Sequence, residues 1–144
     1  KDLNLNRKFN GVYFRAKHRV VLIGIETLNA LILRLGDKAN EIATAAGLNV
    51  AQVYKNESLD PHNPENWHRS LSRFLRYTGW GMLRSFGKNS VVIDKPAIKS
   101  ANFLESFLKA FLDSDVKVIS NTPHRIEFAL LTNRKRNFAS IIPP

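Results

Sequence analysis

Residue types that often perform catalysis occur in this chain, but their spacing builds no catalytic site. The histidines fall in segments expected to be strand starts, loops and a helix, and they are His18, His62, His68 and His124. His62 and His68 are separated by an expected helix start, in a spacing that matches no metal-binding motif. Phosphate-binding glycine loops and nucleophile elbows are also missing from the sequence. We therefore expect no enzymatic activity, no metal and no cofactor.

Large aromatic side chains offer a different chemistry, the binding of an apolar molecule. Phe103, Phe107 and Phe111 recur every four residues, so they lie on one face of an expected helix. An incompletely filled space beside them would be an apolar cavity suited to a hydrophobic ligand, whereas a filled space would be ordinary core. Periodicity leaves both possibilities open. The predicted ligand-binding residues are Leu28, Ile32, Phe74, Trp80, Phe103, Phe107 and Phe111.

A second candidate chemistry is the reading of DNA by a helix-turn-helix motif. Ala43, Gly47 and Val53 have the spacing of that motif, with the small residue where two helices meet and glycine at the turn. A short helix beginning at Asn49 would then enter the major groove. The residues that it would present to bases or phosphates are Gln52, Lys55 and Asn56.

The positive charge is concentrated at the two ends of the chain. The formal net charge is +10, and residues 1–19, with six basic residues and one acidic residue, contribute +5 of it. Arg134, Lys135 and Arg136 add +3, which leaves residues 20–133 almost neutral. Basic ends are typical of solvated arms, and they also attract anionic partners such as nucleic acid.

The helices expected to position these residues begin with one long amphipathic helix. Apolar residues recur in steps of three and four from residue 25 to residue 46, and Gly47 is expected to end the helix. Another helix is predicted from Asn63, with Pro64 at its first position, to Gly79. A capping box of Asn102 and Glu105 predicts the start of the Phe-rich helix.

Strands complete the expected fold. Residues 82–86 and 91–93 are predicted to form one hairpin, residues 116–120 and 125–131 a second, and residues 9–23 a possible early strand. We predict an α/β fold of the α+β type, in which an antiparallel sheet of about four strands packs against helices.

The domain organisation follows from length and charge. With 144 residues, the chain suits one domain over residues 19–131, between a basic arm at 1–18 and a basic tail at 132–144. The expected assembly is a homodimer formed through the long helix. The absence of cysteine and of a membrane-spanning apolar run favours a cytoplasmic location.

The element order resembles that of a known family. The long helix with Leu35-Gly36-Asp37-Lys38-Ala39, the corner Tyr77-Thr78-Gly79-Trp80-Gly81, the Phe-rich helix and the closing strand with Ile126-Glu127-Phe128 are similar to the 4-vinyl reductase domain family. That family is similar in fold to the Golgi transport-particle subunits and the haem nitric-oxide sensors. The resemblance implies a regulatory domain, often dimeric, that binds a small hydrophobic molecule. The cysteines that suggest a metal site in many members are missing here.

We predict non-catalytic binding of a hydrophobic small molecule for sensing, carrying or scaffolding. The alternatives are a DNA-binding transcription regulator, which predicts salt-dependent DNA binding, and a structural adaptor, which predicts a solid core and a stable protein partner.

Overall fold

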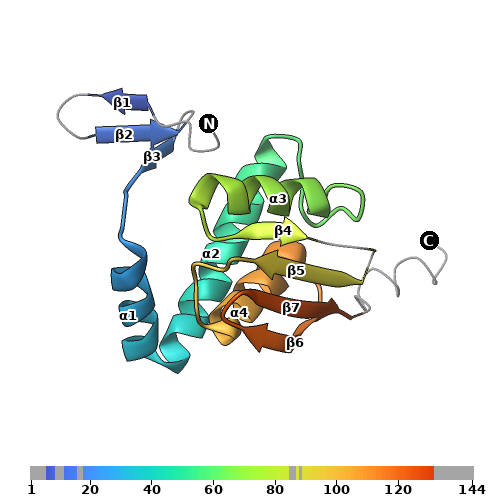
Figure 1. Ribbon diagram of the computed structural model, residues 1–144. Helices are drawn as coiled ribbons and strands as arrows, with labels where there is room; N and C mark the ends of the chain where they lie inside the picture. The colour runs from blue at the N-terminus through green and yellow to red at the C-terminus, as the bar shows by residue number, and fades with distance from the viewer. Residues whose placement is uncertain (1–5, 9–11, 16–17, 85–86, 88, 132–144) are drawn as a thin grey trace.

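The computed structural model describes residues 6–8, 12–15, 18–84, 87 and 89–131, with only the backbone described for residues 6–8, 12–15 and 18. Four helices and two antiparallel sheets make up this part of the chain (Figure 1). The α/β fold class with a four-stranded antiparallel sheet is confirmed. No helix within the described ranges is long and apolar enough to cross a membrane.

The first sheet is a small antiparallel unit of three strands near the N-terminus. Strands β1 (Asn6–Lys8), β2 (Val12–Arg15) and β3 (His18–Val20) pair in sequence order. Within the range predicted to hold an early strand, residues 9–23, β2 and β3 are strands, while residues 9–11 and 16–17 lie outside the described residues. Figure 1 shows this sheet at the upper left, joined to α1 by an extended segment and set apart from the second sheet.

The predicted long helix is two helices. Helix α1 (Ile25–Leu35) ends at Gly36, and α2 (Asp37–Asn56) begins directly after it. Gly36 has a φ of +57° and a ψ of −128°, a conformation that L residues with side chains rarely adopt. The sequence period continues across this position, since Leu35 and Ala39 keep the apolar spacing, which is why the break was not predicted.

Gly47 lies inside α2 and does not end it. The helix continues to Asn56, so the predicted helix-turn-helix corner and the helix start at Asn49 are both wrong. The physical reason is close packing: a Cβ on Gly47 would lie 2.5 Å from the carbonyl oxygen of Phe107 in α4. Ala39 and Ala43 are also buried along α2, so small residues line this side of the helix.

Helix α3 (Trp67–Thr78) begins later than predicted. Residues 61–66 form turns, in which the Asn63 side chain accepts a hydrogen bond from the Glu65 amide at 2.9 Å. The buried Ser70 hydroxyl donates to the Leu59 carbonyl oxygen at 2.7 Å and so ties the preceding loop to the helix. The C-cap is Gly79 in the left-handed conformation, as the sequence predicts.

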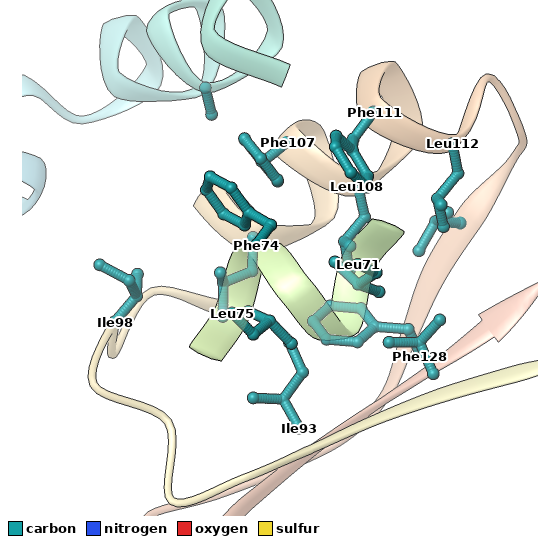
Figure 2. Packing of buried hydrophobic residues seen from close by; sticks show 14 of the residues in the cluster. Leu71, Phe74, Leu75, Ile93, Ile98, Phe107, Leu108, Phe111, Leu112 and Phe128 are labelled. Atoms are coloured by element: carbon teal, nitrogen blue, oxygen red, sulfur yellow. The ribbon is translucent and has the colours of Figure 1, made fainter. Parts of the chain in front are cut away.

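The second sheet has the strand order β4-β5-β7-β6, and every neighbouring pair is antiparallel. Its strands are β4 (Met82–Arg84), β5 (Ser90–Asp94), β6 (Val116–Thr122) and β7 (Arg125–Leu130). Val91 pairs with Phe128, and Ile93 with Ile126, so these buried side chains share one face. Figure 2 shows Ile93 and Phe128 pointing toward leucines of α3.

The opposite face of this sheet carries charge. The Asp94 carboxylate accepts from Arg125 Nε at 2.7 Å and from Arg84 Nε at 2.8 Å, which links three neighbouring strands. The hydrogen bond from Arg125 lowers the pKa of the Asp94 carboxyl below its usual value, although partial burial opposes this effect.

Helix α4 (Ala101–Leu112) is capped two residues earlier than predicted. The Ser100 hydroxyl oxygen accepts from the Phe103 amide at 3.1 Å, so the cap is Ser100 and not Asn102. Glu105 does not close a capping box. Its carboxylate accepts from the Val118 amide of β6 at 2.8 Å, beside an irregularity in the pairing of β6 with β7. This bond attaches the helix to the edge of the sheet.

Candidate functional site

An aromatic cluster lies where α3, α4 and the start of β4 meet. The rings of Phe74 and Phe107 are stacked with centroids 4.9 Å apart, and those of Phe107 and Phe111 with centroids 5.5 Å apart. Trp80 approaches Phe74 edge-on at 4.9 Å and Phe107 at 5.2 Å. Phe103 completes the cluster, with its ring 6.1 Å from that of Trp80. Stacked and edge-on contacts of this kind are the favoured arrangements of aromatic pairs.

Backbone geometry explains why these rings meet. The four-residue spacing of Phe103, Phe107 and Phe111 puts them on one side of α4. Figure 2 shows Phe107 and Phe111 on α4 with Phe74 of α3 beside them. The turn after Gly79 then places Trp80 beside them. Helix α2 approaches α4 closely at Gly47, against the backbone of Phe107 and Phe111 and the side chain of Ala110. Three helices thus determine where the rings lie.

Burial decreases from one end of the cluster to the other. Phe111 is completely buried and Phe107 is 1% exposed, whereas Phe74 is 7% and Phe103 6% exposed. Trp80 is half-buried. The aromatic cluster is therefore closed at Phe111 and approaches solvent at Trp80.

Helix α1 contributes apolar side chains and one polar anchor to the same core. Ile32 is buried within it, and Leu28 packs against it. The Asn29 side chain donates to the Ala97 carbonyl oxygen at 2.9 Å and accepts from the Lys99 amide at 3.0 Å. Ala97 in turn donates its amide to the Trp80 carbonyl oxygen at 2.8 Å. Asn29 therefore connects α1 to the segment that adjoins the exposed end of the aromatic cluster.

The structure brings the seven residues predicted to bind ligand into one hydrophobic core. Five of them form the aromatic cluster, while Leu28 and Ile32 reach the core from α1. Their role as a ligand site stays a prediction. The sequence analysis did not single out Asn29 or Tyr54, although both contact this region. The ring of Tyr54 lies 6.0 Å from that of Phe111. Neither position departs from an ordinary helical pattern.

The residues predicted to read DNA are exposed at the end of α2. Gln52 donates to the Asn56 side-chain oxygen at 3.0 Å, and Lys55 lies between them in sequence. Because α2 is continuous, these residues do not belong to a separate second helix. The arrangement lacks the corner by which a helix-turn-helix positions its recognition helix.

Sequence reasoning also missed a polar hollow on the charged side of the sheet. Its volume is about 510 Å³, and it is open to solvent. The side chains come from three separate segments, so no motif marks them. They are Asp94, Lys95, Ser120, Thr122, His124, Arg125 and Glu127. Since Asp94 is already bonded to two arginines, the charges within this hollow are largely balanced.

Within the part of the chain that the structure describes, no group of three or more acidic or histidine side chains could hold a metal ion. His62 is half-buried, and its Nε2 lies 3.2 Å from the Ala110 carbonyl oxygen, where it attaches the loop before α3 to α4. That position is structural.

A solved structure with a similar fold is the crystal structure of the phenol-responsive sensory domain of the transcription activator PoxR with phenol. The TM-score is 0.62, the match covers 97% of this chain and 92% of that chain, and the sequence identity is 10%. No family model and no curated protein sequence matches the chain. This chain therefore shares the fold of that domain, whereas membership of the 4-vinyl reductase family stays a prediction.

Proposed function

We propose that this protein binds a hydrophobic small molecule without transforming it, and that the ligand lies against the aromatic cluster beneath α1. The observation that carries this proposal is the graded burial of the cluster, from Phe111 at 0% to the half-buried Trp80. A stacked aromatic surface that is buried at one end and reaches solvent at the other suits a flat apolar molecule.

The shared fold supports a sensing role. The PoxR domain responds to phenol, and it matches this chain over nearly the whole length. An aromatic molecule of similar size is therefore the ligand class that we favour. A molecule placed among Phe74, Trp80 and Phe103 would touch both α3 and α4. Binding would then change the contacts of the segment at Ala97 and Lys99, which Asn29 joins to α1.

We further propose that the protein acts as a homodimer. Several apolar side chains of α1 remain exposed in a single chain, including Leu33 and Leu31. Exposed apolar surface of this kind usually marks an interface. A cytoplasmic location stays a prediction from the absence of cysteine.

Two measurements test ligand binding. Purified protein is extracted with organic solvent and examined by mass spectrometry for a retained compound. Separately, phenol and toluene are titrated while tryptophan fluorescence is recorded in a Trp67→Phe background, so that the signal comes from Trp80. We expect saturable quenching by at least one of the two probes, or a retained compound.

Matched variants locate the site. Phe107 and Leu108 are neighbours on α4 and both are 1% exposed, so truncating either to alanine costs about 2 to 5 kcal/mol of stability. We expect Phe107→Ala to weaken probe binding about tenfold or more, and Leu108→Ala to weaken it little. If no compound is retained and neither probe binds the wild type, the proposal fails and the adaptor hypothesis is favoured. Equal losses in both variants would place the ligand elsewhere.

A further inference from the structure

Helix α1 is apolar on more of its circumference than a single chain can cover. Leu28 and Ile32 face the core, yet Leu33 is 81% exposed and Leu31 is 48% exposed. Large apolar side chains that lie exposed together on one helix often mark an interface. The outer surface of α1 therefore lacks a partner among the described residues of one chain.

The outer face of α1 also carries a symmetric pattern. Glu26, Ala30 and Arg34 are spaced four residues apart, so they lie on one face, which is opposite Leu28 and Ile32 at 100° per residue. All three are exposed, and neither Glu26 nor Arg34 forms an ion pair with any other residue that the structure describes. The acid and the base are equally distant from Ala30 along the chain.

We propose that α1 pairs with α1 of a second copy of this chain in antiparallel orientation, with the two-fold axis passing at Ala30. In this arrangement each Glu26 faces Arg34 of the other copy, and the two Ala30 methyl groups meet at the axis. Leu31 and Leu33, which lie on either side of this face, cover the outer surface of the opposite helix.

A second copy is the partner that the charges favour. A two-fold contact must be complementary to itself, and a helix with one acid in its first turn, one base in its last turn and a small residue midway meets that condition. The exposed charge pair determines the register more than it strengthens the contact, because such pairs contribute only about 0.2 to 1 kcal/mol.

Exposed apolar side chains are not confined to α1. The segment before α1 extends the same kind of surface, since Val21 is 84% exposed and Leu22 57% exposed. Ile23, Ile25 and the outer leucines of α1 are exposed as well, so apolar side chains accompany the charged pair that sets the register.

This inference rests on the proposed homodimer and specifies its interface. It places α1 between two contacts, with the aromatic core on its inner side and the second copy on its outer side. The residues of the outer side do not touch the aromatic cluster. The interface and the ligand site can therefore be changed independently, and a failure of one proposal can be told apart from a failure of the other.

Analytical ultracentrifugation of the full chain over a range of concentrations tests the interface. The wild type should form dimers, and Ala30→Glu, which places two carboxylates together at the axis, should weaken dimerisation about a hundredfold. Glu26→Arg and Arg34→Glu should each weaken it about tenfold, while the double variant E26R/R34E should return to within about threefold of the wild type. Ile119→Ser, at an exposed apolar residue of the edge strand β6, should have no effect.

Each other outcome overturns the proposal. A wild type that is monomeric up to its solubility limit excludes a dimer, and a dimer unaffected by Ala30→Glu excludes this face. A double variant as weak as the single variants excludes the antiparallel register. Circular dichroism verifies that every variant is folded, and titration of Ala30→Glu with phenol and toluene should give the wild-type result, whether or not the wild type binds either probe.

Discussion

The carbonyl oxygen of Phe107 lies 2.5 Å from the position that a Cβ on Gly47 would occupy. The Cβ of Ala110 would be 2.9 Å away, so the contact involves both backbone and side chain of α4. Glycine at this place lets α2 and α4 pack more closely than any other residue would allow.

Gly47→Ala should therefore destabilise the protein, although alanine favours a helix by about 1 kcal/mol over glycine. The methyl group would force α2 and α4 apart, and overpacking typically costs about 1 to 3 kcal/mol. We expect the free energy of unfolding measured in urea to fall by about 1 kcal/mol or more. The exposed Ala45→Val serves as a control on the same helix. Equal or higher stability of Gly47→Ala would contradict the close packing.

Asn29→Ala should loosen α1 without unfolding the domain. The side chain makes two hydrogen bonds to the loop at Ala97 and Lys99, and each such bond contributes about 0.5 to 1.5 kcal/mol. Amide hydrogen exchange in α1 should become faster, whereas exchange in α4 should stay slow. Asn49→Ala, at an exposed position of α2, is the matched control. Unchanged protection of α1 would show that Leu28 and Ile32 hold it without Asn29.

Two alanine substitutions distinguish the observed cap of α4 from the predicted one. Ser100→Ala removes the acceptor of the Phe103 amide and should lower the unfolding free energy by about 1 kcal/mol. Asn102 is exposed and lies at the second position of the helix, so Asn102→Ala should change the unfolding free energy by less than about 0.5 kcal/mol. Chemical denaturation of both variants measures the difference, and the reverse order would restore Asn102 as the cap.

Asp94→Asn should change how stability depends on acidity. Because Arg125 lowers the pKa of folded Asp94, the carboxylate stabilises the protein above its unfolded pKa, near the ordinary value of 3.8. That contribution is lost as the pH falls through the lower pKa of the folded state. The variant should therefore be less stable than the wild type at neutral pH, and the two should converge below pH 3.8. Thermal denaturation of both proteins in steps of about one pH unit, from neutral to acidic pH, measures this effect. A stability difference between variant and wild type that stays constant over the whole series would rule out the linkage.

Local patterns in the sequence were enough to predict most of the second sheet and α4. The Phe and Leu stripe from residue 103 to residue 112 has a clear helical period, and both strand pairs contain β-branched runs next to turn residues. The end of α3 was also predictable, because Gly79 is the kind of residue that a left-handed C-cap requires.

The errors arose where contacts between distant segments decide the structure. A glycine within an apolar pattern resembles a helix end, and only the presence of Phe107 on the far side of the interface explains why Gly47 continues the helix. Likewise, Glu105 has the spacing of a capping box, but its partner is the Val118 amide from another element. The seven predicted ligand-binding residues could be grouped from periodicity, whereas periodicity does not report whether a ligand has room among them.

The bond between Glu105 and Val118 has a consequence for how copies of this protein avoid unwanted association. Strand β6 forms one edge of its sheet, and an edge with free backbone donors can recruit a strand from another molecule. Here the helix carboxylate occupies one of those donors, and the pairing irregularity between Val118 and Ser120 bends the strand at the same place. A strand from another molecule could therefore not use the Val118 amide without displacing Glu105.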